Sequence, residues 1–308
     1  MTALGVLVLP EHMGRSAVRV WREAEQLGFA HAWTLDHLSW RLPADAPWYD
    51  AMTTLAVAAC HTTTMTLGTL VTTPNFRHPV LVAKQAMALD RMSDGRFVLG
   101  VGAGAPGPDA AALGDAALSP AQRGHRYEEF VTLVDLLLRQ ETSTFRGRFY
   151  RSEDVRMAPG CVRQPRLPLA LAATGPRGMR LAARVADLWV TIGDTRRPGT
   201  QPEDEAFTTL RRQIRRLREA AEDLGRAAGG ETGAVSGPPR RVVNLSRIVP
   251  DPYASAERLA DLVGRCAELG FTDVVLARPR ADGVFAGDLA AFERAVLHVG
   301  RHLSPIEQ

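Results

Sequence analysis

The 308-residue chain has little cysteine and no long apolar run. Its three cysteines, Cys60, Cys161 and Cys266, are far apart in the sequence and form no CxxC pair, which argues against a disulfide framework. No apolar stretch approaches the roughly 20 residues that a membrane-spanning helix needs. We therefore expect a reduced, cytoplasmic environment and no membrane partner.

Lysine is nearly absent, since Lys84 is the only one and arginine carries almost all the positive charge. The formal net charge is +3, and acidic residues are interleaved with the arginines throughout. This pattern lacks the clustered basic surface that nucleic-acid binding requires, so we expect no nucleic-acid partner. The run Leu4–Leu9 has the character of a buried strand and lacks the basic flank of a signal peptide, which again favours a cytoplasmic protein.

Several common sequence motifs of cofactor binding and catalysis are absent as well. There is no GxGxxG followed by an acidic residue about twenty positions on, which excludes a Rossmann dinucleotide site, and there is no GxSxG nucleophile motif. The histidines outside the strand ends show no metal-ligand spacing, so no metal is predicted. These histidines are His61, His125, His298 and His302.

Apolar strand-like runs alternate with amphipathic helical segments at intervals of 30 to 40 residues, a pattern typical of parallel strands with crossover helices. Eight strands are expected, each followed by a helix, and this number predicts one (β/α)8 barrel domain over residues 1–308. The expected strands are Leu4–Leu9, Ala30–Leu35, Thr66–Val71, Phe97–Val101, Leu167–Ala173, Leu188–Ile192, Val242–Val249 and Thr272–Leu276. The expected helices are Ser16–Leu27, Asp50–Cys60, His78–Met92, Arg123–Arg139, Met179–Val185, Glu203–Arg226, Ala254–Leu269 and Leu289–His302.

The alternation is interrupted by a long insertion after the fourth strand, Ala105–Pro168. It contains the helix expected at Arg123–Arg139 and a hairpin expected around Thr144–Tyr150. Long insertions at the carboxyl end of a strand are usually functional, so we expect this one to form a substrate wall.

Polar or glycine-rich residues follow three of the expected strands, where barrel enzymes place their active sites. Asp36-His37 could exchange a proton near neutral pH, although an N-cap aspartate beside an exposed histidine has the same appearance. Gly102-Ala103-Gly104 and Thr174–Gly178 could each bring backbone amides to a phosphate, or could be ordinary turns. Trp40, Trp48 and Tyr49 lie in one loop and would suit stacking on a flat ligand.

Other conspicuous residues have a structural interpretation. Arg77-His78-Pro79 matches the start of a helix with proline in its first turn, and Asp94-Gly95-Arg96 matches a turn before the fourth strand. Neither is expected to carry chemistry.

Four stretches together resemble the bacterial luciferase-like superfamily of flavin- and deazaflavin-dependent oxidoreductases. They are WTLDH (Trp33–His37), LGTLVTTPNFRHPVLVAKQAMALDRMSDGRFVLGVGAG (Leu67–Gly104), FRGRFY (Phe145–Tyr150) and AATGPRGMRLAARVADLWVT (Ala172–Thr191). The superfamily fold is a (β/α)8 barrel with an insertion after strand four. Leu70–Asn75 and Asp36-His37 are most similar to the branch that uses coenzyme F420, so the resemblance implies F420 as cofactor, with FMN as the alternative.

The resemblance also assigns residues. It places His37 near the reactive carbon of the deazaflavin, with Asp36 as the second catalytic residue, and it places a non-proline cis peptide between Leu70 and Val71. Gly175 and Arg177 would lie nearest the cofactor's phosphate. The implied cofactor-binding set is Asp36, Leu70, Val71, Thr72, Gly102, Gly104, Ala173, Thr174, Gly175, Arg177 and Thr191. The implied substrate-binding set is His12, Trp40 and Trp48.

One departure from the branch matters. Some of its sugar-phosphate dehydrogenases carry an acidic residue just after the Gly-rich exit of strand four, where this chain reads Ala105-Pro106-Gly107-Pro108. This weakens a sugar-phosphate dehydrogenase interpretation and would leave proton transfer to Asp36, His37 or the Glu11-His12 pair.

The activity that the resemblance implies is hydride transfer between F420 and a small organic substrate, with reduction of a C=C or C=N bond as the leading direction. An FMN-dependent monooxygenase that uses reduced flavin and O2 is the first alternative, and a related barrel that has lost activity and serves as a partner subunit is the second. A homodimer is expected, because dimers are common in the superfamily.

Overall fold

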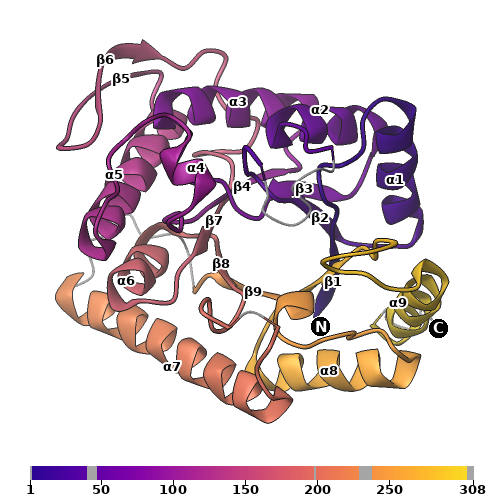
Figure 1. The fold of residues 1–308 in the computed structure, drawn as a ribbon. Helices are drawn as coiled ribbons and strands as arrows, with labels where there is room; N and C mark the ends of the chain where they lie inside the picture. Colours follow the sequence, from indigo (N-terminus) through magenta and orange to yellow (C-terminus); the bar gives the residue numbers. More distant parts are fainter. Residues whose placement is uncertain (1, 40–46, 198, 229–237, 304–308) are drawn as a thin grey trace. The chain divides into compact units, whose positions relative to one another are not determined.

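The computed structural model describes residues 2–39, 47–197, 199–228 and 238–303. Its strands form a closed barrel in the order β1-β10-β9-β8-β7-β4-β3-β2, which confirms the predicted (β/α)8 fold (Figure 1). The barrel strands are β1 (Ala3–Leu7), β2 (His31–Thr34), β3 (Thr66–Thr69), β4 (Phe97–Val101), β7 (Leu169–Ala172), β8 (Leu188–Thr191), β9 (Arg240–Asn244) and β10 (Asp273–Ala277).

The strands form from short runs that are apolar on both faces. All five residues of β4 and all five of β10 are buried, as expected for strands enclosed by side chains of the barrel interior on one face and by helices on the other. The chain divides into two compact units. The first unit comprises Met1–Leu9, Arg22–Trp33 and Ala173–Gln308, and the second comprises Pro10–Trp21 and Thr34–Ala172.

In the second unit, β4 pairs in parallel with β3 and with β7. Helix α3 packs between α2 and α5, as Figure 1 also shows. The helices of this unit are α2 (Ala51–His61), α3 (Pro79–Met92), α4 (Pro108–Ala111) and α5 (Pro120–Arg139). Strands β5 (Thr142–Arg146) and β6 (Arg151–Arg156) form a separate antiparallel hairpin, which confirms the hairpin expected in the insertion.

In the first unit, β1 pairs in parallel with β2 and β10, and β9 pairs with β8 and β10. Helix α7 packs against α6 and α8, and α8 packs against α9. The helices are α6 (Pro176–Val185), α7 (Glu203–Ala228), α8 (Ala256–Leu269) and α9 (Leu289–Leu303), and a 3-10 turn, η1 (Leu245–Arg247), follows β9. Helix α1 (Arg15–Gln26) contributes residues to both units.

Helix boundaries follow local capping chemistry. Ser119 and Gln122 form a reciprocal capping box at the start of α5, with Pro120 in the first turn, so this helix begins three residues before the predicted Arg123. At the other end of a helix, Gly270 adopts a left-handed conformation (φ 90°) and terminates α8.

Two further sequence-based boundaries were wrong, and one helix was missed. The strand expected over Val242–Val249 ends at Asn244, because the apolar residues that follow enter the turn η1 and not a longer strand. Helix α6 begins at Pro176 and therefore includes Arg177 and Gly178, which had been assigned to a loop. The short helix α4 was not expected at all. Within the described ranges, no helix is long and apolar enough to cross a membrane.

Candidate active site

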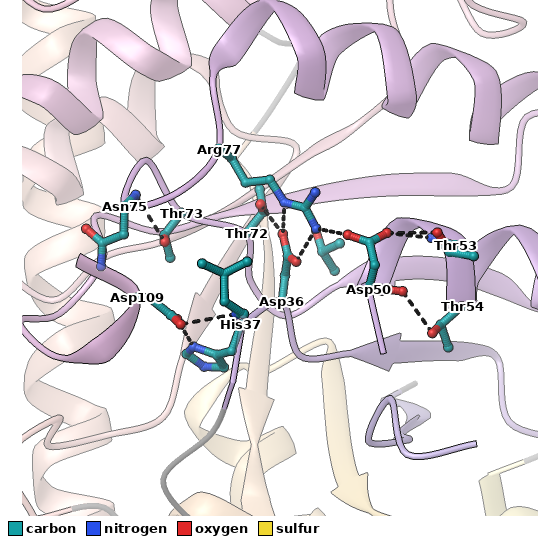
Figure 2. Close-up of polar contacts among 12 residues, drawn as sticks. Asp36, His37, Asp50, Thr53, Thr54, Thr72, Thr73, Asn75, Arg77 and Asp109 are labelled. Atoms are coloured by element: carbon teal, nitrogen blue, oxygen red, sulfur yellow. Dashed lines mark hydrogen bonds and ion pairs between the residues drawn. The ribbon is translucent and has the colours of Figure 1, made fainter. Parts of the chain in front are cut away.

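Asp36 follows β2 and forms the centre of a polar cluster in the second unit (Figure 2). Its side chain is fully buried. Arg77 donates to it through both Nε (3.0 Å to Oδ2) and Nη2 (2.6 Å to Oδ1), and the hydroxyl of Thr72 donates to Oδ2. A buried carboxylate is stable only when paired and hydrogen-bonded, and these three contacts meet that condition.

Arg77 also joins Asp36 to the start of α2. Its Nη2 donates to Asp50 Oδ2 at 2.6 Å, while Asp50 Oδ1 accepts from the amide of Thr53 at 2.9 Å and so caps the helix. Burial opposes ionisation of Arg77, but the hydrogen bonds and charges of Asp36 and Asp50 raise its pKa overall. Burial likewise acts against Asp50, but the Thr53 amide and Arg77 lower its pKa. One guanidinium thus fixes three segments of the chain.

His37 forms an ion pair with Asp109, the second residue of α4, as Figure 2 shows. The distance between Nδ1 and Oδ2 is 2.5 Å, and Asp109 Oδ1 accepts from the backbone amide of Leu38 at 3.1 Å. The His37 side chain is 33% exposed and that of Asp109 is 11% exposed. Asp109 therefore holds the His37 ring through Nδ1.

The predicted substrate-binding residues are only partly accounted for. The indole Nε1 of Trp48 donates to the carbonyl of His37 at 2.8 Å, and the two rings lie 6.3 Å apart. The structure therefore places Trp48 beside His37. His12 is partly exposed in the loop after β1. Trp40 lies outside the described residues.

At the exit of β3, the peptide bond between Leu70 and Val71 is cis, which confirms the geometry that the resemblance implied. The amide of Leu70 donates to the carbonyl of Thr34 at 2.8 Å, and Thr72 bridges to Val101 of β4. Thr72 is fully buried, and its hydroxyl is committed to Asp36. Its side chain therefore organises this exit.

The glycines after β4 permit close approach of the β3 exit. A Cβ on Gly102 would lie 2.7 Å from Val71 Cγ2, and a Cβ on Gly104 (φ 75°) would lie 2.6 Å from Asn75 Oδ1. Asn75 Nδ2 donates to the carbonyl of Ala105 at 2.9 Å, and Asn75 Oδ1 accepts from Arg126 Nη2 at 2.6 Å. Packing between the two exits therefore accounts for both glycines.

In the first unit, the segment from Ala173 to Gly178 begins α6. Gly175 is the N-cap, is exposed, and no side chain caps the helix. A Cβ on Gly178 would lie 3.0 Å from that of Ala173, so the glycine lets α6 start close to the β7 exit. Thr174 is partly exposed and Arg177 is exposed. An uncapped helix start beside open space is suited to an anion.

Thr191, the last residue of β8, is buried. Its hydroxyl donates to Gln213 Oε1 at 2.7 Å and accepts from the amide of Gly193 at 3.0 Å, and Gln213 Nε2 donates to the Gly193 carbonyl at 2.9 Å. These bonds fix the β8 exit to α7. No cluster of three or more potential metal ligands occurs in the described ranges.

Sequence reasoning missed two residues of this site. Asp109 was overlooked because it lies four residues beyond Ala105, in a Pro- and Gly-containing stretch that was expected to carry no acid for catalysis. Arg77 was interpreted as part of a helix start, a role that its neighbour His78 fulfils by accepting from the amide of Val80. The signal for Arg77 was the buried Asp36 itself, since a buried carboxylate requires a cationic partner.

The closed barrel, with an ion-paired histidine and a buried, paired aspartate beyond its strands, defines an enzyme-like (β/α)8 architecture. The chain belongs to the luciferase-like monooxygenase family, whose family model matches residues 3–296.

Individual relatives have related but distinct activities. The F420-dependent glucose-6-phosphate dehydrogenase of Beutenbergia cavernae is 31% identical over 303 residues, covering 84% of this chain and 86% of its own. The 4-hydroxyprotoasukamycin monooxygenase of Streptomyces nodosus subsp. asukaensis is 31% identical over 216 residues, covering 66% of this chain and 56% of its own. The solved structure of an F420-dependent secondary alcohol dehydrogenase with an F420-acetone adduct superposes with a TM-score of 0.75 at 18% identity, covering 97% and 99% of the two chains, and supports the fold.

Proposed function

We propose that this protein is an F420-dependent oxidoreductase that transfers a hydride between the deazaflavin and a small organic substrate. The observation that carries the proposal is the His37–Asp109 ion pair, which is held beside the buried Asp36–Arg77 pair. A hydride donor or acceptor needs a partner group that moves a proton, and this pair provides one. The F420-dependent dehydrogenase among the relatives supports the choice of cofactor.

His37 is the proposed acid–base residue. Asp109 Oδ2 accepts from Nδ1–H, and Nε2 is the proposed atom that gives a proton to the substrate when His37 is charged or takes one when it is neutral. Asp109 thus orients the ring. Because Asp109 belongs to the segment after β4, that segment supplies an acidic residue after all, and the sequence-based argument against a sugar-phosphate dehydrogenase loses its force.

Asp36 is proposed as a positioning residue. Its two oxygens are occupied by Arg77 and Thr72, and it has no exposed surface through which to meet a ligand. It holds the backbone of His37 against the β3 exit. This positioning role for Asp36 replaces the direct part in proton transfer that the resemblance implied.

Each of the two units offers residues that would suit one part of the cofactor. In the second unit, Leu70, Val71 and the Gly102–Gly104 exit would face the deazaflavin ring. In the first unit, the uncapped start of α6 at Gly175, with Ala173, Thr174 and Arg177 around it, offers amides and a cation to the phosphate. Thr191, held in place by its hydrogen bond to Gln213, would line the cofactor at the exit of β8. When bound, the reduced cofactor supplies the hydride.

The proposed reaction is reduction of a C=C or C=N bond. The bound reduced cofactor would supply the hydride to one carbon of the double bond, and His37 would donate the Nε2 proton to the other atom, so that the two transfers together balance in charge. The same pair would serve the reverse reaction, in which Nε2 takes the proton back from the C–H or N–H group of the reduced substrate. His12 and Trp48 are proposed to contact the substrate, as is Trp40.

The proposal is tested by fluorescence titration of the pure protein with F420 and, separately, with FMN. We expect quenching of F420 fluorescence at micromolar concentration and no comparable binding of FMN. Tight FMN binding without F420 binding would support instead the alternative, a flavin-dependent monooxygenase; the Streptomyces relative is named a monooxygenase.

A further inference from the structure

Arg247 lies at the carboxyl end of β9, the side of a barrel on which ligands bind. It is the last residue of η1. The amide of Ile248 donates to the carbonyl of Leu245 at 2.9 Å, and the amide of Ala277 donates to Ser246 Oγ at 2.8 Å. Leu245 and Ile248 are both buried. The backbone that carries Arg247 is therefore fixed to β10.

An aromatic ring lies beneath the guanidinium of Arg247. The Cζ atom is 5.9 Å from the centroid of Phe285, within the range of a cation–π contact. Phe285 has a left-handed backbone (φ 59°), and its carbonyl accepts from the amide of Arg280 at 2.9 Å. Arg280 Nη1 also donates to the carbonyl of Asp282 at 2.9 Å. The loop after β10 is thus tied down with its ring under Arg247.

The guanidinium of Arg247 has no anionic partner in the described part of the chain, where it forms neither an ion pair nor a hydrogen bond. Arginines at the neighbouring strand exits are paired, since Arg197 binds Glu205 and Arg278 binds Glu23. Arg247 is partly buried, and burial alone lowers its pKa. Removing a cation from water without a counter-charge costs free energy, which an anionic ligand would recover.

We propose that Arg247, supported by Phe285, binds an oxoanion, either a carboxylate or a phosphate, of a ligand that enters at the carboxyl ends of β8–β10. The planar guanidinium can form two parallel hydrogen bonds to such a group. The proposal rests on the proposed function for the ligand's identity, because the anion can belong to the substrate or to the acidic tail of the cofactor. In either case the enzyme is selective for an anionic group at this position.

The test compares wild type, Arg247→Gln and Arg247→Lys with a matched control, Arg196→Gln. Arg196 follows β8, and its side chain is 89% exposed. Far-UV circular dichroism and thermal melting first establish that all four proteins fold. Each is then titrated with inorganic phosphate by calorimetry, with F420, and with the deazaflavin nucleoside that lacks phosphate and acidic tail.

We expect Arg247→Gln to lose about 10- to 100-fold in affinity for phosphate or F420, the range for one charge-assisted contact. Arg247→Lys should retain part of it, and Arg196→Gln all of it. Weaker F420 binding with unchanged nucleoside binding assigns the anion to the cofactor, and weaker phosphate binding alone assigns it to the substrate.

Unchanged affinity of Arg247→Gln for both phosphate and F420 overturns the proposal. A wild-type protein that binds phosphate through Arg247 but does not bind F420 contradicts the proposed function and leaves the anion site standing. The two failures are therefore distinguishable.

Discussion

The ion pair between Arg77 and Asp36 makes the sharpest prediction about stability. Arg77→Met keeps the length of the side chain but leaves Asp36 buried, with no exposed surface and no cation. Breaking one side of a buried ion pair costs about 3–5 kcal/mol. Typical domain stability is about 5–15 kcal/mol, so the loss would be a large fraction of the total.

A matched control separates the buried contact from the exposed one. Asp50→Asn removes the other carboxylate that Arg77 binds, but its side chain is 42% exposed and asparagine is also a good N-cap. This variant should lose no more than about 1 kcal/mol. Urea denaturation at pH 7 measures both values.

The double variant completes a thermodynamic cycle. If Arg77 acts mainly through Asp36, Arg77→Met combined with Asp36→Asn should cost less than the sum of the single changes by about 1–3 kcal/mol. Additive free energies, or a loss below about 1 kcal/mol for Arg77→Met alone, would refute the argument that this pair organises the site.

Three further predictions follow from other contacts. Asp109→Asn should lower kcat by about 10- to 100-fold, while the affinity for F420 stays within about twofold. The control Asp115→Asn, which changes an exposed carboxylate on the same segment, should alter neither kcat nor F420 affinity, and equal losses in both variants would contradict the role of Asp109. Gly104→Ala should destabilise the protein by about 1–3 kcal/mol in urea denaturation, because Gly104 has φ 75° and an added Cβ would overlap Asn75. Gly264→Ala in α8, where the added Cβ has open space, should be neutral or stabilising by up to about 1 kcal/mol, and a tolerated Gly104→Ala would show that Asn75 can move away. Burial acts to raise the pKa of Asp273, but the hydrogen bonds to His31 and Thr272 and the charge of Arg240 lower this pKa overall. The carboxylate therefore stabilises the fold above the unfolded pKa of about 3.9, and this stabilisation is lost as pH falls through the lower folded pKa. The stability advantage of wild type over Asp273→Asn should shrink between about pH 5 and pH 3, and an advantage independent of pH would contradict the assignment.

The barrel could be predicted from the sequence because its strands are short, continuously apolar runs at regular spacing. The same rule failed at β9. Its apolar run continues past Asn244 into Leu245 and beyond, and periodicity alone does not separate a buried strand from a buried turn that follows it. The strand therefore appeared several residues too long.

The polar strand ends were predictable, but their partners were not. Asp36 and His37 were singled out because they follow a strand in a barrel pattern. Their partners, Arg77 and Asp109, lie 41 and 72 residues further along the chain. Each has a plausible local role at a helix start, and only the closed fold brings it to the site.

The central claim is that this barrel uses F420 with His37 as its acid–base residue. The most direct measurement is F420 fluorescence quenching with wild type and His37→Ala, followed by single-turnover oxidation of reduced F420 in the presence of candidate enones and imines. The account predicts that both proteins bind F420 with similar affinity and that the variant loses about 10²- to 10⁴-fold in turnover. Absence of F420 binding by the folded wild-type protein, or full turnover by His37→Ala, would contradict it.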